Sequence, residues 1–528
     1  MTAAPHLSAE LRRSLGAYYT PDRAVGLMAS WVLDRSPGSV LEPSFGDGAF
    51  LMAVQAEAAS RGVQPHLVGA ELHQSAFDYA TERLNLEIEG HAGDFLSLKP
   101  RPVDAVIGNP PFVRLRHLPA EQRVSALHAS GAALGSPMDP SGSTWMSFVL
   151  HSTEFVAAGG SLALVLPHEL TYVRYARPLW DFLGRSFGRV KVVRTYERMF
   201  PELLQDVVVL LAEKRGSTST EIEFQVTSTL KKLDTRSGTV RLGLSEVAGG
   251  SRSFVFALMP VAARELTQDV LMPATTAIRD LAKVRIGYVA GDKRYFHPTR
   301  AEAKDFRLPE RSLRRTLSQA RGLRGAGLFT SQLDAEASQL LWLPDRAALT
   351  AGERRYIEDG ERKDVDKRYK CSVRSPWYVV PGVETPDIVV SVFSDNPLLL
   401  VNDGEFTASN SLLTATMKEG NKVEDLVAGF YTSVTQLFIE LEIHSLGGGV
   451  LIAVPNELGK VRVPKVRGTK THLRGLDTAL RAGDFERARD LGDRALIKSG
   501  VLTAHQIESV KEGVAVLQEW RKRPTRSL

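Results

Sequence analysis

Cysteine is nearly absent from this chain, and long hydrophobic runs are absent altogether. Cys371 is the single cysteine among 528 residues, so no intrachain disulfide can form and a metal site built from several cysteines is excluded. No window of about twenty residues is apolar enough to span a bilayer, and residues 1 to 13 lack the apolar core of a signal peptide. We therefore expect a cytoplasmic protein that makes no membrane contact.

Charge is spread unevenly along the chain, although the net charge is only +5. Residues 1 to 213 hold 18 Lys+Arg and 22 Asp+Glu, a net of −4, whereas the remaining residues hold 48 and 39, a net of +9. The hydrophobic content of 43% is typical of a globular protein, and the length favours two large domains with or without a small helical appendage. The basic second half has two interpretations: it binds a polyanionic partner, or its surplus Lys and Arg only keep the surface solvated.

Between residues 40 and 212, short apolar runs alternate with helical stretches, which predicts a parallel sheet with crossover helices. The predicted strands are Ser39–Leu41, His66–Ala70, Ala105–Gly108, Ser161–Leu166, Lys191–Thr195 and Val207–Ala212. The last two are joined too closely for a crossover helix, so we expect an antiparallel hairpin at the sheet edge. Beyond residue 245 the patterns are mixed, with basic clusters at 307–324, 353–374 and 460–474 and helical periodicity over 478–498 and 505–521.

The tetrapeptide Asn109-Pro110-Pro111-Phe112 follows the apolar run 103–108. An exocyclic amine on a planar base is a weak nucleophile because its lone pair is delocalised into the ring. The amide oxygen of Asn109 and the carbonyl of Pro110, aimed by the two prolines, can accept from its two hydrogens. Phe112 offers an aromatic face to an extruded base. The tetrapeptide therefore has two interpretations. It forms a site for the methylation of such an amine, or it is only the end of a strand that runs into a proline-rich turn.

Residues 40 to 51 are typical of a strand, a glycine-containing turn and the start of a helix. Gly46 and Gly48 would let a ligand approach the backbone closely. Glu71 follows the next apolar run and can bind both hydroxyls of a ribose, whereas Asp94 can accept from an adenine amine while Phe95 packs on the ring. All would lie at the carboxyl edge of one parallel sheet, where such folds bind ligands.

Two carboxylates, Glu42 and Asp47, flank the glycines of this turn. They disfavour a pyrophosphate and favour a ligand with an ammonium group, so we expect S-adenosylmethionine as the methyl donor. Methylation of cytosine at carbon 5 needs a thiolate nucleophile, and the sole thiol, Cys371, lies far downstream. No histidine shows ligand spacing, and we expect no metal.

Together these segments resemble the DNA N6-adenine methyltransferases of type II restriction–modification systems whose motifs run in the order donor site, catalytic site, recognition domain. The resemblance is strong over residues 11 to 213, where it rests on residues 16–21, 42–51, 109–112 and 199–201. It is fainter over 287–291, 375–378 and 447–450, which are similar to the recognition domains of the TaqI and BsuBI/PstI groups. Ser44-Phe45 replaces a small residue and a cysteine of many relatives, and Phe112 replaces the commoner tyrosine.

The resemblance implies an α/β class I S-adenosylmethionine-dependent methyltransferase fold, Rossmann-like, with a seven-stranded sheet and an antiparallel edge hairpin, and then a mixed α+β domain. It implies a catalytic domain over residues 1–245, a target-recognition domain over 246–475 and a helical segment over 476–528. The implied catalytic residues are Asn109, Pro110, Phe112 and Phe200, with the base held between the two phenylalanines. The implied donor-binding residues are Tyr19, Thr20, Glu42, Ser44, Gly46, Gly48, Glu71, Leu72, Asp94, Phe95 and Asn109.

The implied activity is site-specific methylation of the N6 amine of an adenine flipped out of double-stranded DNA, by an enzyme that acts as a monomer and protects DNA from a cognate restriction endonuclease. Two alternatives remain open. The same tetrapeptide suits the methylation of a ribosomal RNA base or of a protein glutamine. The chain could also be a DNA-binding subunit that carries an inactive methyltransferase fold.

Overall fold

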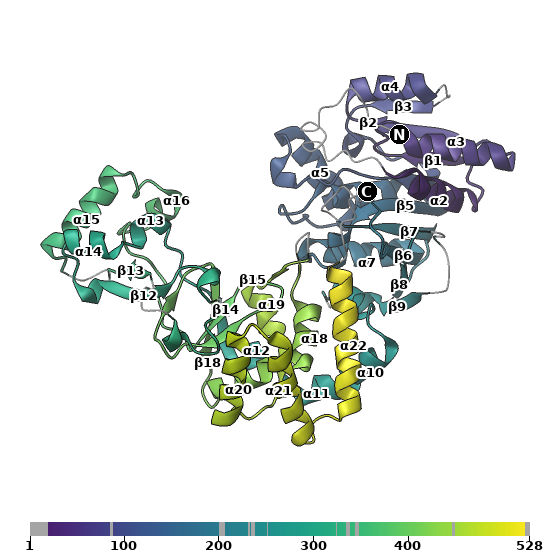
Figure 1. The fold of residues 1–528 in the computed structure, drawn as a ribbon. Helices are drawn as coiled ribbons and strands as arrows, with labels where there is room; N and C mark the ends of the chain where they lie inside the picture. Colours follow the sequence, from purple (N-terminus) through teal and green to yellow (C-terminus); the bar gives the residue numbers. More distant parts are fainter. Residues whose placement is uncertain are drawn as a thin grey trace. The chain divides into compact units, whose positions relative to one another are not determined.

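The computed structural model describes residues 20–84, 88–199, 206–230, 233, 238–250, 252–323, 325–333, 338–343, 348–445 and 449–522. They form two compact units, with the division between Leu258 and Met259 (Figure 1). Among the described residues, no helix is both long and apolar enough to cross a membrane.

The first unit is built on one large sheet. Its strands are β1 (Ser39–Glu42), β2 (His66–Glu71), β3 (Ile88–Ala92), β4 (Val103–Gly108), β5 (Val156–Pro167), β6 (Phe187–Thr195), β7 (Val207–Arg215), β8 (Glu221–Thr227) and β9 (Thr239–Gly243). Its helices are α2 (Asp22–Leu33), α3 (Ala49–Arg61), α4 (Gln74–Leu84), α5 (Ala120–Leu134), α6 (Thr144–Phe155), α7 (Arg177–Ser186), α8 (Leu244–Ala248) and α9 (Ser253–Phe256).

The strands lie in the order β3-β2-β1-β4-β5-β7-β6-β8-β9. The first five are parallel, and β7 runs antiparallel to both of its neighbours. The sheet therefore has nine strands among the described residues, two more than the seven expected. The antiparallel pair β6 and β7 does not form its edge, because β8 pairs parallel with β6 and β9 pairs antiparallel with β8.

Alternate residues of the central strands face two different apolar layers, as the period of two in a strand requires. In β4, Ala105 and Ile107 pack with helices α2 and α3, whereas Val106 packs with helices α5, α6 and α7. Ala163 and Leu164 of β5 divide in the same way. This arrangement, with helices on both faces of a mainly parallel sheet, is the α/β architecture predicted from the sequence.

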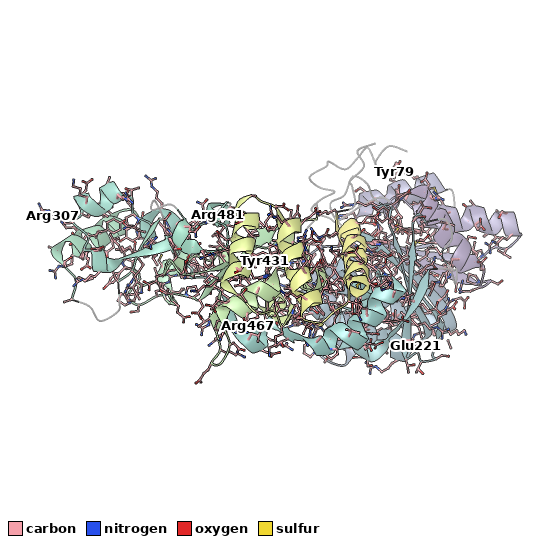
Figure 2. All side chains as sticks on the ribbon, turned by 60° about the horizontal axis from the view of Figure 1, so that its bottom comes forward. Tyr79, Glu221, Arg307, Tyr431, Arg467 and Arg481 are labelled. Atoms are coloured by element: carbon pink, nitrogen blue, oxygen red, sulfur yellow. The ribbon has the colours of Figure 1, made fainter. Side chains whose placement is uncertain are left out.

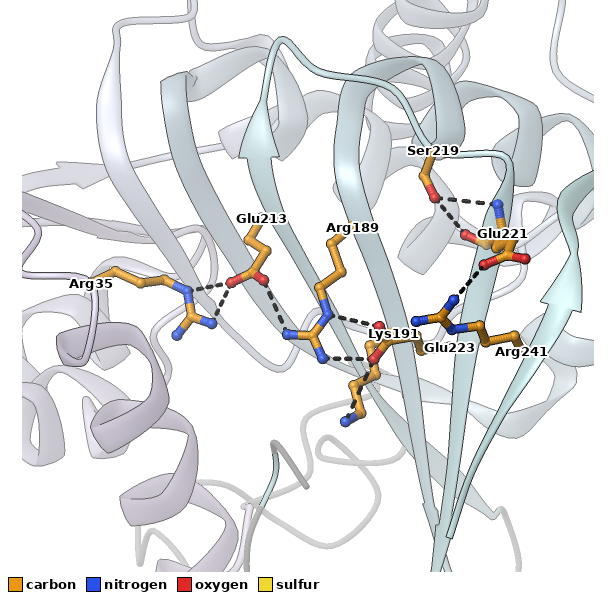
Figure 3. A network of polar contacts seen from close by, with 8 residues as sticks. All are labelled: Arg35, Arg189, Lys191, Glu213, Ser219, Glu221, Glu223 and Arg241. Carbon is orange, nitrogen blue, oxygen red and sulfur yellow. Dashed lines mark hydrogen bonds and ion pairs between the residues drawn. The ribbon is translucent and has the colours of Figure 1, made fainter. Parts of the chain in front are cut away.

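The side of the sheet that bears α2 carries a row of ion pairs beyond its apolar layer (Figure 3). Arg35, just after α2, donates to Glu213 of β7 at 2.7 Å. Arg189 of β6 then bridges Glu213 at 3.1 Å and Glu223 of β8 at 2.6 Å, and Lys191 lies 3.8 Å from Glu223. These cross-strand pairs join the added strand β8 to the rest of the sheet.

The second unit is a mixed α+β domain. Its strands are β10 (Thr275–Ala277), β11 (Ala282–Ile286), β12 (Leu313–Leu317), β13 (Gln339–Leu341), β14 (Ile388–Ser391), β15 (Phe393–Ser394), β16 (Leu399–Val401), β17 (Thr407–Ala408), β18 (Leu412–Met417), β19 (Leu451–Ile452) and β20 (Arg462–Pro464). Its helices are α10 (Val261–Leu266), α11 (Met272–Ala274), α12 (Ile278–Leu281), α13 (Lys293–Phe296), α14 (Arg300–Asp305), α15 (Ala351–Arg362), α16 (Tyr369–Ser372), α17 (Val423–Phe430), α18 (Ser433–Glu442), α19 (Pro455–Lys460), α20 (Lys470–Arg481), α21 (Phe485–Lys498) and α22 (Ala504–Arg521).

The helices at the end of the chain belong to this second unit. The periodicity over 478–498 is broken in the structure, because Gly483 adopts a left-handed φ of 69° and Asp484 caps the start of α21 by accepting from the Arg487 N–H. The last helix is held by a buried ion pair, in which Arg521 Nε donates to Glu440 Oε2 of α18 at 2.8 Å. The three helices therefore pack as part of one domain.

Candidate functional site

A cavity of about 480 Å³ opens at the carboxyl edge of the sheet in the first unit. Its wall contains residues from the ends of β1, β2 and β4 and from the segment before α2. The lining residues are Thr20, Glu42, Pro43, Ser44, Phe45, Gly46, Asp47, Ala49, Phe50, Glu71, Leu72, His73, Ala76, Gly93, Asp94, Phe95, Leu96, Asn109, Pro111, Val113, His117, Leu118, Pro119, Gln122, Thr144 and Phe148.

This cavity brings together nine of the expected donor-binding residues, which are Thr20, Glu42, Ser44, Gly46, Glu71, Leu72, Asp94, Phe95 and Asn109. Gly48 is not part of the wall, but its left-handed φ of 78° shapes the turn into α3. Tyr19 and Phe200 lie outside the described residues. The sequence-predicted donor residues therefore share one cavity with the catalytic asparagine.

Glu42 is the most deeply buried acid of this wall, with 2% of its surface exposed. Its Oε2 accepts from the Leu51 N–H in the first turn of α3, at 3.2 Å. Burial raises the pKa of Glu42 well above its usual range, and the nearby charges of Asp47 and Glu71 raise it further, against the opposing effect of the Leu51 hydrogen bond. A cationic ligand would relieve this crowding of carboxylates.

Glu71 is held in place by two backbone N–H groups. Its Oε2 accepts from Gly46 at 3.0 Å and its Oε1 from His73 at 3.0 Å. Gly46 has a left-handed φ of 53°, so the turn after β1 is shaped to deliver its N–H to the end of β2. Each carboxylate oxygen keeps a further lone pair, which suits it to accept from a pair of neighbouring hydroxyls.

Asp94 and Phe95 lie at the next strand end. Asp94 Oδ1 accepts from the Leu96 N–H at 3.0 Å. Phe95 is buried and belongs to an aromatic cluster, with its ring centroid 5.5 Å from that of Phe148 and 5.1 Å from that of Phe155. Phe95 is thus both a core residue and part of the cavity wall, and the core fixes the orientation of its ring.

The catalytic tetrapeptide divides into two kinds of residue. Asn109 and Pro111 line the cavity, whereas Pro110 is buried and is not part of the wall. Phe112 is half-buried and packs against the apolar layers of both faces of the sheet. The donor cavity therefore extends to the predicted catalytic residue, Asn109.

The segment after the tetrapeptide is fastened to the start of α6. Thr144 Oγ1 accepts from the Val113 N–H at 3.0 Å and donates to the Pro111 carbonyl oxygen. The Val113 carbonyl in turn accepts from the Thr144 N–H at 2.9 Å and from Ser143 Oγ at 3.0 Å. Thr144 and Ser143 are buried, with 4% and 1% of their surfaces exposed. We call Ser143 and Thr144 the loop clamp.

The sequence patterns do not predict the loop clamp, nor another part of the wall. The cavity wall also contains four residues that come after the catalytic tetrapeptide. They are His117, Leu118 and Pro119, just before α5, and Gln122, in its first turn. No local pattern marks these residues. Thr144 lies 33 positions after Pro111, so only the fold reveals their contact.

These features define what the site can do chemically. Four acidic residues, Glu42, Asp47, Glu71 and Asp94, line the cavity and suit a positively charged group, whereas Phe95 and Phe148 suit a flat ring. Asn109 belongs to the same wall, and its side-chain amide oxygen is of the kind that accepts from an amine. The residues present therefore fit S-adenosylmethionine, which combines an ammonium and a sulfonium with a ribose and an adenine.

Two family models match consecutive parts of the chain. The model of the N-6 DNA methylases matches residues 5–176. The model of the C-terminal domain of the type II methyltransferase M.Eco57I matches residues 252–497. The first match covers the motifs of the cavity, and the second covers most of the second unit.

Similar proteins extend over most of the chain. The type II methyltransferase M.AccI of Acinetobacter calcoaceticus is 21% identical over 485 residues, which cover 86% of each chain. The type II methyltransferase M.PaeR7I of Pseudomonas aeruginosa is 24% identical over 490 residues, which cover 81% of each chain. The type IIL restriction-modification enzyme MmeI, solved in complex with DNA, has a TM-score of 0.55 at 13% identity, over 97% of this chain and 80% of that chain. The predicted fold class, a class I methyltransferase fold followed by a further domain, is confirmed.

Proposed function

We propose that the chain transfers a methyl group from S-adenosylmethionine to the N6 amine of an adenine flipped out of duplex DNA, as an enzyme of a type II restriction–modification system. The matches to an N-6 DNA methylase model and to type II methyltransferases support this proposal. The observation that carries the proposal is the acid-lined cavity that ends at Asn109. Its biological role would be the protection of DNA from a cognate endonuclease.

In this proposal the donor supplies an activated methyl group, and the residues of the chain orient it. Glu42 and Thr20 would hold the methionine part, and Glu71, fixed by the N–H groups of Gly46 and His73, would accept from the ribose hydroxyls. Asp94 would accept from the adenine amine of the donor. The fixed ring of Phe95 would provide a flat surface for that adenine.

The target amine would be activated by two acceptors. Asn109 Oδ1 and the Pro110 carbonyl would each accept one amine hydrogen, which returns electron density to the nitrogen as it attacks. Pro110 is buried and its neighbour Pro111 is bound by Thr144, so the carbonyl has little freedom to turn away. Phe112 and Phe200 would stack on the faces of the flipped base. No covalent enzyme intermediate is needed.

The division of labour follows the two compact units. We propose that the first unit performs the methyl transfer, because it contains the whole cavity. The second unit would recognise the target sequence. Its match to a C-terminal domain of a type II methyltransferase and the positive charge of the sequence after residue 213 support this assignment.

The test is to offer three acceptors to the full chain together with methyl-labelled S-adenosylmethionine. These are unmethylated duplex DNA, ribosomal RNA and a protein mixture. The proposal predicts label in duplex DNA, and N6-methyladenine after digestion of that DNA to nucleosides. Label confined to RNA or protein, or label on cytosine, would refute it. Donor binding without any transfer would instead favour the inactive DNA-binding subunit.

A further inference from the structure

The three basic clusters of the second half differ in what their cations contact. In the first cluster, Arg315 donates to the Gly404 carbonyl at 3.1 Å and lies over the ring of Phe406, and Arg314 lies over the ring of Trp342. Both arginines are exposed, but each guanidinium group already lies against an aromatic ring of the unit. They are poorly placed to leave it for a partner.

The second cluster is largely neutralised by acids. Lys363 pairs with Asp359 at 2.6 Å, and Lys367 pairs with Asp364 at 2.6 Å. Arg374 donates to the carbonyl oxygens of Val289 and Ala290. Cations that already have acidic partners or structural hydrogen bonds contribute little to the attraction of a polyanion.

The third cluster is different. Residues 458 to 476 contain six Lys+Arg and no Asp or Glu. Arg462 binds the backbone of Met272 and Thr275, and Lys460 is half-buried. The other four cations are exposed, and they make no ion pair and no side-chain hydrogen bond with any residue that the structure describes. These four, which we call the basic strip, are Lys465, Arg467, Lys470 and Arg474.

The local structure presents the basic strip as a set. Lys465 and Arg467 are exposed and flank the buried Val466, in the short segment between β20 and α20. Lys470 and Arg474 are four residues apart on α20, and thus lie on one face of that helix about 6 Å apart along its axis. Figure 2 marks Arg467 on the second unit.

The segment that carries the basic strip is fixed by its own contacts. The Gly468 N–H donates to Asp425 Oδ1 of α17 at 2.8 Å, and Thr469 caps α20 by accepting from the His472 N–H. A side chain at Gly468 would clash with the Glu424 carbonyl, since an added Cβ would lie 2.3 Å from its oxygen. The strip is therefore a preorganised row of cations on a rigid base.

We propose that the basic strip binds the phosphate backbone of the DNA substrate. This inference rests on the proposed function, because it names the surface with which the same enzyme would hold its duplex. Exposed cations without acidic partners are complementary to phosphates, and their contacts carry no sequence information. The strip would thus set the register of the second unit on DNA, while other residues read the bases.

The experiment compares two fourfold variants of the full chain. The strip variant carries Lys465→Gln, Arg467→Gln, Lys470→Gln and Arg474→Gln. The control variant loses the same charge at cations that already have acidic partners, through Arg362→Gln, Lys363→Gln, Lys367→Gln and Arg481→Gln. Affinity for a duplex is measured from low to moderate salt, and donor binding is measured alongside.

For the wild-type chain, the logarithm of the affinity for duplex DNA should fall steeply as the logarithm of the salt concentration rises. Each lost phosphate contact should reduce that slope by about 0.9, so the strip variant should lose up to roughly 3.6 units of slope and the control almost none. Donor binding should be unchanged in both. An unchanged slope in the strip variant, or equal losses in both variants, would overturn the proposal. A wild-type chain that neither binds nor methylates DNA would refute the proposed function instead.

A footprint on the unmodified chain keeps the test independent of whether the strip variant folds. Lys465 and Lys470 should be protected from acetylation when duplex DNA is added, whereas Lys363 and Lys367 should react equally with and without it. Unprotected Lys465 and Lys470 on a DNA-bound enzyme would also overturn the proposal.

Discussion

The replacement of Thr144 by valine tests whether the loop clamp positions the catalytic carbonyl. Valine has the same shape but can neither accept from the Val113 N–H nor donate to the Pro111 carbonyl. Both groups would be left without these partners in a partly buried setting, at a cost of up to about 1–3 kcal/mol. The loop can regain hydrogen-bond partners only by moving. Such a movement, driven by a free energy of this size, would shift the neighbouring carbonyl of Pro110 away from its position in the wild type.

A distortion worth about 1.4–2.8 kcal/mol at the transition state corresponds to a roughly 10-fold to 100-fold loss of rate. The assay is single-turnover methylation of duplex DNA at saturating donor, together with calorimetric measurement of donor affinity. Thr144→Val should slow the turnover with little change in donor affinity. Thr144→Ser keeps the hydroxyl and should restore most of the rate.

The reasoning would be refuted if Thr144→Val turned over at the wild-type rate, or if Thr144→Ser were equally slow. A parallel loss of donor affinity in Thr144→Val would show that the residue shapes the cavity wall, of which it is also a part, and does not act through the loop.

Three further predictions concern the donor, the base and the stability of the second unit. Because burial and neighbouring acids raise the pKa of Glu42, donor affinity should weaken as pH falls through that raised pKa, since the carboxylate loses its charge while the donor ammonium keeps its own. Glu42→Gln should bind the donor more weakly at a pH above that raised pKa and should lose this pH dependence in titration calorimetry. A wild-type affinity that stays flat with pH would contradict the assignment. Phe112→Ala and Phe200→Ala should each weaken the extruded state by about 1–3 kcal/mol, seen as reduced emission of a fluorescent base analogue at the target, whereas Phe112→Tyr should keep the emission. Arg521→Met leaves Glu440 without its ionic partner, and only 1% of the Glu440 side chain is exposed, so the free energy of unfolding of the second unit in urea should fall by about 3–5 kcal/mol. The control, Lys511→Met, breaks an exposed pair with Asp490 and should cost under about 1 kcal/mol. Equal shifts of the unfolding midpoint in the two variants would be inconsistent with this ranking.

The parts of the fold that the sequence predicts well are those with a local signal. Buried parallel strands give continuous apolar runs, as at residues 103–108, and polar residues that end such runs meet at one edge of the sheet. For this reason the sequence alone predicts that Glu42, Glu71 and Asn109 lie together. It does not predict β3, because most residues of that strand are exposed and its composition lacks an apolar run.

The rest depends on contacts between distant residues. The Thr144 hydroxyl meets the catalytic loop only after a short 3₁₀ helix, α5 and a loop have folded between them, and nothing near residue 144 signals that contact. The seven strands that the resemblance implies are too few, because β8 and β9 extend the sheet. The sequence after residue 221 favours added edge strands, and β8 lies there, but its pairing partners follow only from the fold. Likewise, the sequence shows that residues 458–476 lack acids, but only the structure shows which cations of the three clusters have partners and which are exposed.

The central claim is that the donor cavity delivers its methyl group to an amine held by Asn109. The most direct test compares Asn109→Ala with the wild type in single-turnover methylation of duplex DNA, with N6-methyladenine quantified after digestion and donor affinity measured on the same preparations. The loss of one transition-state acceptor should slow methylation at least about 100-fold while donor affinity stays close to the wild-type value. Methylation at the wild-type rate, or a loss of donor binding as large as the loss of rate, would contradict this account.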